Sequence, residues 1–163
     1  IKIMARIQSE EPRAIEYQQR LMRSMEMKPL LISLAIMRFS IGLFFVVWAA
    51  EKITAPEITQ EIFSTFYRIP LSNSLAFAIG LFQLFVILAF MLGLFKTWSC
   101  GLLLGMHLVS TLSVYKQLLN PYEPPNYLLW AAVPLLGSLI ALFILRDRDQ
   151  LFTLPSLVTR RGQ

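Results

Sequence analysis

Three polar side chains stand out because they lie deep inside long apolar runs of the sequence, where burying such a group has to be explained. They are Arg38, Gln83 and His107. An ionisable side chain near the centre of a membrane helix costs at least about 2.5–3.5 kcal/mol on insertion scales, so it needs a partner or a purpose. A guanidinium and an imidazole sheltered together could bind a carbonyl oxygen or relay a proton.

The three side chains lie at similar depths when residues are counted from the ends that we assign to the cytoplasm. At 1.5 Å per residue, Arg38 is about 12 Å deep, His107 about 14 Å and Gln83 about 18 Å. We expect them to meet if they face one interior. Simpler interpretations stay open, since Arg38 can snorkel to headgroups and the other two can form hydrogen bonds between helices.

Lys52 is a further candidate for a polar core, because it shares a helical face with Arg38. Steps of four and three residues place Gly42, Phe45 and Ala49 between them. The two basic groups would lie about 21 Å apart along the helix. Phe45 could then line a ring pocket beside Arg38, while the simplest interpretation of Lys52 is that it snorkels to the outer headgroups.

Four apolar runs must position these residues. They cover residues 30–50, 74–95, 98–118 and 127–145, and each is close to the roughly 20 residues needed to cross a bilayer. The 163-residue chain is 56% hydrophobic and 15% charged, with a mean hydropathy of +0.59, which is too apolar for an ordinary soluble domain. We therefore predict an all-α integral membrane four-helix bundle. Pro134 interrupts the last run, where a kink is tolerable because neighbouring helices can satisfy the freed carbonyl.

Basic residues outside the runs predict the orientation. Eleven of them fall before the first run, after the last run or at Lys96. Only Lys52 and Arg68, together with Lys116 at the outer end of the third run, fall on the opposite side. Both termini are therefore expected in the cytoplasm, as segments 1–29 and 146–163. Anionic lipid explains the net charge of +5 better than nucleic acid does, because the basic residues flank the spans.

Two short amphipathic helices are expected outside the spans. Ser9-Glu10-Glu11-Pro12 is typical of a helix start. The apolar stripe that follows it would suit a membrane surface or a docking partner, and consists of Ile15, Leu21, Met22 and Met25. Residues 56–67 form the second candidate, and the proline-rich residues 120–126 should form a rigid turn.

The residues that the sequence lacks argue against several chemistries. One histidine cannot supply a bis-histidine haem site, and one cysteine, Cys100, can form neither an internal disulfide nor an iron-sulfur cluster. The sequence has no dinucleotide-binding glycine motif, no P-loop and no paired-histidine zinc motif. We expect no metal site, and a self-contained redox enzyme with protein-ligated metals is disfavoured.

Four stretches of the sequence carry a resemblance to a known family: Arg38 to Phe45 (Arg-Phe-Ser-Ile-Gly-Leu-Phe-Phe), Glu51-Lys52, Gly93-Leu94-Phe95-Lys96 and the Arg-Asp tail at 146–149. On these residues the chain resembles the DoxX-like family of four-helix bacterial membrane proteins. This family includes the small membrane subunit of thiosulfate:quinone oxidoreductase and is similar to MauE-type proteins. The resemblance covers roughly residues 32–150, and departs from the family pattern at Ala49-Ala50-Glu51 and at Gln83.

The resemblance implies a multi-pass protein of the bacterial cytoplasmic membrane that works with other subunits. Our leading hypothesis is a structural or accessory subunit of a larger, hetero-oligomeric respiratory or redox complex that is not catalytic alone. The alternative is a quinone-binding or proton-relay module that uses Arg38 and His107, with help from Gln83. A small-solute transporter is less favoured, and the only small-molecule partners expected are a quinone or a phospholipid.

Overall fold

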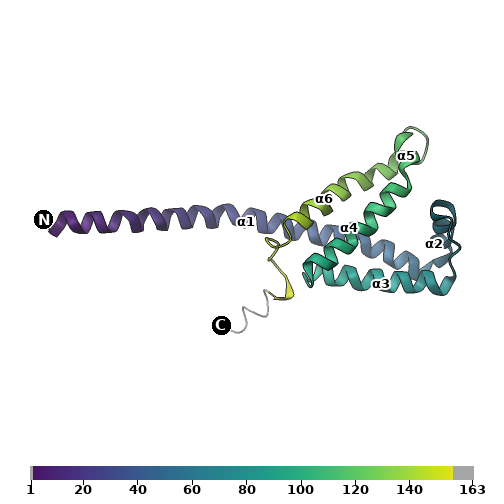
Figure 1. Ribbon diagram of the computed structural model, residues 1–163, viewed down its shortest axis with the longest axis horizontal. Coiled ribbons are helices and arrows are strands. Elements are labelled where there is room, and N and C mark those ends of the chain that lie inside the picture. The colour runs from purple at the N-terminus through teal and green to yellow at the C-terminus, as the bar shows by residue number, and fades with distance from the viewer. Residues whose placement is uncertain (1, 156–163) are drawn as a thin grey trace.

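The computed structural model describes the backbone of residues 2–155 and the side chains of residues 15–22, 24, 25 and 27–155. All regular structure in this part of the chain is helical. Figure 1 shows a bundle of helices from which the first half of α1 extends as a single rod. The elements are α1 (Lys2–Thr54), α2 (Pro56–Ile62), the π-helical η1 (Phe63–Tyr67), α3 (Asn73–Met91), α4 (Lys96–Ser113), α5 (Tyr115–Leu119), the 3-10 helix η2 (Asn126–Ala131) and α6 (Ala132–Ile144).

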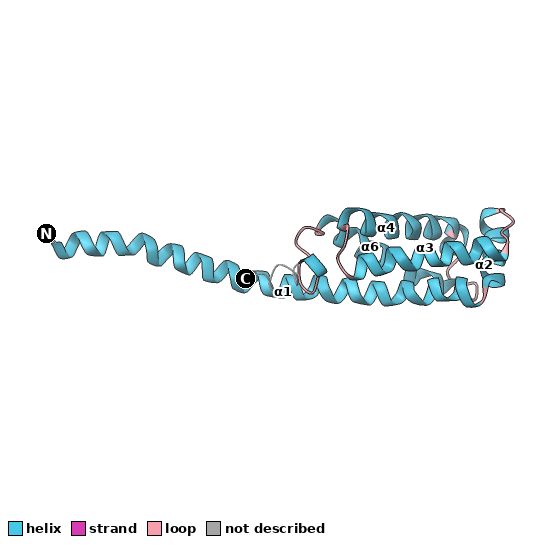
Figure 2. Cartoon of the chain, turned by 90° about the horizontal axis from the view of Figure 1, so that it is seen from below, coloured by secondary structure: helices cyan, strands magenta, loops and turns pink. Residues whose placement is uncertain are grey.

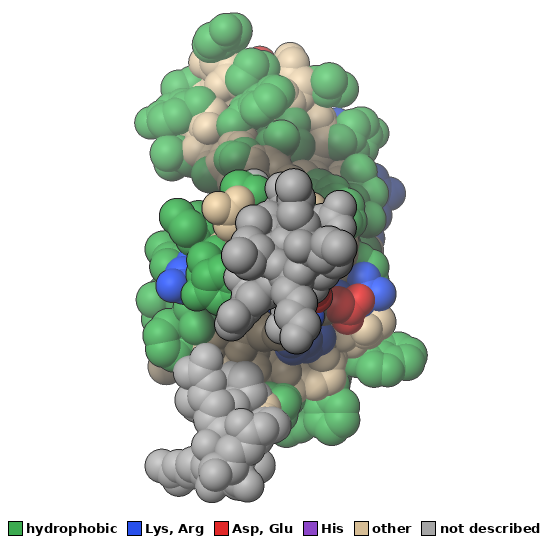
Figure 3. Space-filling model, turned by 90° about the vertical axis from the view of Figure 1, so that its left-hand side faces the viewer, with side chains coloured by type: hydrophobic (Ala, Val, Ile, Leu, Met, Phe, Trp, Pro, Cys, Tyr) green, Lys and Arg blue, Asp and Glu red, His purple; other side chains and the backbone are tan. Residues whose placement is uncertain are grey.

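The bundle consists of the second half of α1 together with α3, α4 and α6. Helix α3 packs along α1, and α4 packs against both α3 and α6. Figure 1 shows the α4–α6 pair inclined to the α1–α3 pair, and Figure 2 shows the two pairs as adjacent layers. Side chains from all four helices make up the core, which is centred on Phe45, Ala49, Ile87, Leu103 and Leu139. Hydrophobic side chains also cover much of the outer surface in Figure 3, as expected of a protein surrounded by hydrocarbon.

Local sequence explains where α3 begins and ends. At its start, the hydroxyl of Ser72 accepts a hydrogen bond of 3.3 Å from the backbone N–H of Leu75. At its end, Gly93 adopts a left-handed conformation with φ of 68°. The N–H of Gly93 donates to the carbonyl of Phe90, and the N–H of Leu94 donates to that of Ala89. These two bonds form a Schellman motif, so the helix stops before residue 95, where the apolar run had placed its end.

The first helix differs from the prediction, because α1 continues without a break from Lys2 to Thr54. No new helix begins at Ser9, and segment 2–29 shares one axis with the first apolar run (Figure 1). A proline inside a helix removes one backbone donor and its ring crowds the carbonyl four residues earlier. The chain nevertheless remains helical past both Pro12 and Pro29. The expectation of a separate amphipathic helix is therefore corrected to an extension of α1.

The remaining segments agree more closely with the helices expected from the sequence. Residues 56–67, expected as one short helix, form α2 and η1 in succession. The last apolar run begins as η2 and becomes α-helical at Ala132. Pro134 thus lies in the first turn of α6, two residues after the change from 3-10 to α-helical geometry.

Three of the described helical segments are long and apolar enough to cross a membrane, judged by length and composition. They are Ile15–Thr54 within α1, Asn73–Met91, and Asn126–Ile144, which joins η2 to α6. Helix α4 has 18 residues and includes polar ones such as Lys96, Thr97 and Ser99. It packs between α3 and α6 in the bundle.

Candidate functional site

Arg38 is completely buried on α1 and faces the segment that follows α6. Its Nη1 donates a hydrogen bond of 2.5 Å to Oδ1 of Asp149. Its Nη2 donates to the carbonyl oxygen of Leu151 at 2.6 Å and, over a longer distance of 3.4 Å, to that of Phe152. Arg38 is 1% exposed and Asp149 is 6% exposed, so this charge pair is shielded from solvent. The guanidinium thus holds the segment after α6 against α1.

The turn between α3 and α4 holds the same segment from another direction. Nζ of Lys96 donates to the carbonyl oxygen of Asp149 at 2.6 Å. The N–H of Leu154 donates to the carbonyl of Leu92 at 2.9 Å. Gly93 packs so tightly against Thr153 that a Cβ at residue 93 would lie 2.5 Å from Cγ2 of Thr153. We call this arrangement the tail latch, and define it as Arg38, Leu92, Gly93, Lys96 and residues 149–154.

Little space is left inside the tail latch. A cavity of about 10 Å³ lies against Arg38, Cys100, Arg146 and Asp149, and this volume is at the lower limit for one water molecule. Nε of Arg38 is buried and has no hydrogen-bond partner among the described residues. The tail latch therefore joins α1, the α3–α4 turn and the C-terminal segment, and in this conformation it has no room for a substrate-sized ligand.

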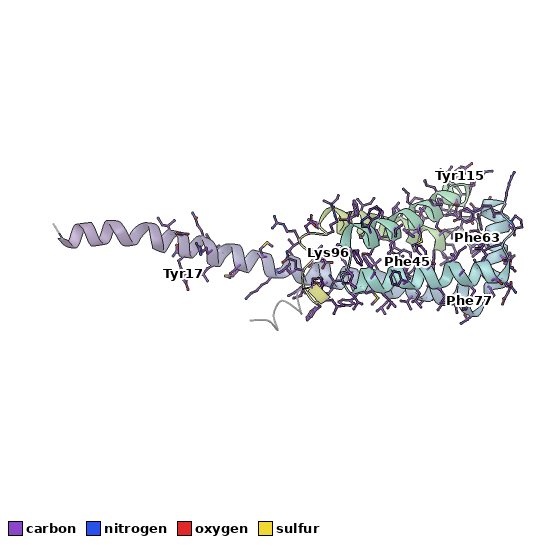
Figure 4. All side chains as sticks on the ribbon, turned by 60° about the horizontal axis from the view of Figure 1, so that its bottom comes forward. Tyr17, Phe45, Phe63, Phe77, Lys96 and Tyr115 are labelled. Atoms are coloured by element: carbon purple, nitrogen blue, oxygen red, sulfur yellow. The ribbon has the colours of Figure 1, made fainter. Side chains whose placement is uncertain are left out.

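His107 lies in a different place, where α4 meets α6 and α1. The residue is 1% exposed, and Nε2 is 3.0 Å from the carbonyl oxygen of Ala132. A carbonyl can only accept, so Nε2 carries the proton and donates it. The rings of Phe45 and Trp48 have their centroids 5.6 and 6.4 Å from that of the imidazole. Figure 4 shows Phe45 inside the bundle. Buried Nδ1 has no partner among the described residues.

Arg38, Gln83 and His107 are all buried, but the structure does not assemble them into one site. No hydrogen bond among the described residues joins any two of the three. Gln83, on α3, is 5% exposed. Lys52 turns back on its own helix, since its Nζ donates to the carbonyl of Trp48 at 3.1 Å. In the described part of the chain, no three His, Cys, Asp or Glu side chains are grouped as a metal site.

Sequence reasoning did not identify the two groups that complete the latch, Asp149 and Lys96, as site residues. The available signal was charge balance. Arg38 is buried in an apolar run, none of the four predicted runs contains a carboxylate, and the first acids after the last run are Asp147 and Asp149. An arginine at that depth needs a counter-charge, so one of these two acids was a candidate.

Replacing His107 with leucine should weaken the packing of α4 against α6. The substitution removes the hydrogen bond to Ala132 and leaves that carbonyl without its side-chain donor, which costs about 1 kcal/mol for bonds between membrane helices. Unfolding of the full chain in mixed micelles measures this loss. Leu108→Ala, on the exposed face of the same helix, provides the control and should change stability less. If His107→Leu and the unmodified chain unfolded at the same midpoint, the hydrogen bond from His107 to Ala132 would not stabilise the packing of α4 against α6.

The fold and these buried contacts define an all-helical integral membrane protein whose polar side chains tie helices and the C-terminal segment together. Comparison with protein-family models matches the DoxX model to residues 33–116, slightly more than half of the 163-residue chain. The chain therefore belongs to the DoxX family, which confirms the resemblance. The comparisons with curated proteins and with solved structures gave no match. The matched region includes Arg38 and His107 but ends before Asp149.

Proposed function

We propose that this chain is a structural or accessory subunit of a larger membrane complex, and that the complex is a redox assembly of the kind the resemblance implies. The observation that carries this proposal is the isolated first half of α1. It extends away from the bundle in Figure 1, and every described side chain between Ile15 and Met25 is exposed. Tyr17, labelled in Figure 4, lies far along this rod. Such a helix needs a partner, because most helices are stabilised by packing rather than by propensity alone.

One face of the extension suits a companion helix. Its apolar side chains fall within about 120° of the helical wheel at 100° per residue. The opposite face carries the exposed ion pair between Glu16 and Arg20, with a distance of 2.7 Å. The apolar face consists of Ile15, Leu21, Met22 and Met25, which are 55%, 44%, 60% and 68% exposed. Methionine side chains adapt well to a partner surface, so this face favours a companion protein.

In this proposal the chain crosses the bacterial cytoplasmic membrane four times, with α4 as the third span and both ends in the cytoplasm. The basic residues of the sequence support this orientation. The tail latch supports it as well, because it holds residues 149–154 at the end of the bundle from which the α1 extension leaves (Figure 1). An even number of spans accounts for that arrangement, and the α1 extension then projects into the cytoplasm.

The alternatives receive less support from the geometry. A quinone-binding or proton-relay module would need Arg38 and His107 to share a ligand, whereas each has its own protein partners. The cavity of about 10 Å³ beside Arg38 is far too small for a quinone ring. A solute transporter would need a path past the tail latch, where the cavity beside Arg38 is no larger than one water molecule. The subunit role therefore remains our leading proposal.

Photo-cross-linking tests the proposal directly. A photo-reactive amino acid at Met22 should join the full chain to one companion polypeptide in intact membranes. The same group at Gln19, outside the apolar face, should give far less product. Met22→Lys combined with Met25→Lys should lower co-extraction of that companion about tenfold or more. Each methionine, once buried against the companion, would contribute over about 1 kcal/mol to binding. Cofactor absorbance of the extracted complex then tests the redox assignment.

A matched double variant distinguishes the loss of the apolar contact from the effect of two added positive charges. Gln19→Lys with Ser24→Lys adds the same two positive charges to neighbouring positions outside the apolar face. This control should retain the companion. A strictly monomeric chain after mild extraction, or equal loss of the companion in both double variants, would reject the proposed docking face.

A further inference from the structure

A separate apolar groove follows the outward face of α1 inside its membrane-spanning part. Its volume is about 650 Å³, within the range of roughly 300–1,000 Å³ typical of small-ligand sites. One wall is the face of α1 between Lys28 and Leu43, and Leu151 and Phe152 from the tail latch contribute to the other. The small residues Ala35 and Ser40 also line the groove.

The length of the groove fits one leaflet of a bilayer. Lys28 and Leu43 are fifteen residues apart, which corresponds to about 22 Å along a helix. Half of a bilayer's hydrocarbon core is about 15 Å thick. With Lys28 at the level of the headgroups, the groove therefore follows the leaflet and ends near the middle of the membrane. A single extended chain would have this length and direction.

Charge is concentrated at one end of the groove. Among the described residues that line the groove, Lys28 is the only charged one, and it is exposed. Arg148 brings a second cation to the same end, since its Nη1 lies 4.0 Å from Sδ of Met27, the residue before Lys28. Among the side chains that the structure describes, neither Lys28 nor Arg148 forms an ion pair, although Asp147 is also exposed nearby in sequence. The two basic groups are thus available to an anionic group.

We propose that this groove binds one acyl chain of an anionic glycerophospholipid, with Lys28 and Arg148 holding its phosphate. An amphiphile with one charged end and a long apolar chain matches the distribution of lining residues. A membrane helix fits less well, because Ala35 and Ser40 are five residues apart and lack the four-residue spacing of small residues at close helix contacts. The proposal goes beyond the subunit role and requires only that α1 crosses the membrane.

Lipid retention by the purified full chain tests the site. The protein is equilibrated in mild detergent with phosphatidylglycerol and phosphatidylcholine of identical acyl chains, and lipids that remain bound are counted by native mass spectrometry. We expect one tightly held phosphatidylglycerol. Lys28→Gln should lower the preference for phosphatidylglycerol about fivefold, the effect of one basic residue near an anionic surface. Lys116→Gln, an exposed lysine outside the groove, should leave the preference unchanged.

A second pair of variants tests the acyl chain. Ser40→Trp fills the groove and should abolish retention, whereas Val47→Trp introduces the same ring seven residues further along α1, beyond the groove, and should not. Equal retention of the two lipids by the unmodified chain, or retention unaffected by both Lys28→Gln and Ser40→Trp, would overturn the proposal. A companion helix cross-linked to Ser40 in intact membranes would also overturn it. Lys28 is exposed at the end of the groove, so its substitution tests the site even if Ser40→Trp fails to fold.

Discussion

Arg38→Met destabilises the folded chain by about 3–5 kcal/mol, and Asp149→Ala produces a comparable loss; this is the largest effect that we expect. Removing one member of a buried ion pair leaves the other as an uncompensated charge, which costs more than the pair itself contributes. Arg38 is 1% exposed, and it also supplies the donors for the carbonyls of Leu151 and Phe152. Its loss therefore releases the C-terminal segment as well.

Two measurements check this expectation. Reversible unfolding in mixed micelles gives the stability, and limited proteolysis at residues 147–155 reports whether the segment has separated from α1. The double variant Arg38→Met with Asp149→Ala should lose less than the sum of the single losses, because no unpaired charge remains in it. Arg20→Gln is the matched control, since Arg20 forms an exposed ion pair with Glu16 and such pairs contribute under about 1 kcal/mol. Similar effects for Arg38→Met and Arg20→Gln would show that the buried pair does not hold the latch.

The sequence predicted the helical class and the family because both depend on patterns along the chain. Apolar runs of about 20 residues indicate membrane helices whatever surrounds them. The residues of the Gly93-Leu94-Phe95-Lys96 turn, which carried part of the resemblance, now have physical roles: Gly93 and Leu94 complete a Schellman motif and Lys96 donates to Asp149. The number of spans and their orientation remain predictions.

The partners of the buried polar residues could not be predicted in the same way. Counting residues gives the depth of Arg38 and His107 along their helices, but the rotation of each helix and the course of the C-terminal segment decide what each side chain meets. Arg38 meets Asp149, which is 111 residues away, and His107 meets a backbone carbonyl that has no sequence signature. The continuity of α1 was also missed, because capping residues and prolines indicate possible helix starts and do not require them.

Gly93→Ala should destabilise the chain by about 2–4 kcal/mol, for two separable reasons. An alanine held at φ of 68° pays for a left-handed backbone, at about 1 kcal/mol or more. Its Cβ would also lie 2.5 Å from Cγ2 and 2.7 Å from Cβ of Thr153, and such overpacking costs about 1–3 kcal/mol. Thr153 has little room to move, because it is 1% exposed and the backbone N–H of the next residue, Leu154, donates a hydrogen bond to the carbonyl of Leu92. Unfolding in mixed micelles measures the total.

Two further variants divide that loss into its causes. Gly137→Ala in α6 is the control, because an added Cβ there has no neighbour within 4 Å. Alanine is also the better helix former by about 1 kcal/mol, so Gly137→Ala should leave stability unchanged or raise it. In a Thr153→Gly background, adding Gly93→Ala should lower the free energy of unfolding only by the backbone contribution, since both close atoms of Thr153 are then absent.

Gly93 and Arg38 hold the same segment, so Gly93→Ala should lower the free energy of unfolding less in an Arg38→Met background than in the unmodified chain. Full additivity of the two would mean that the glycine turn and the ion pair act independently, and that the tail latch is not one cooperative unit.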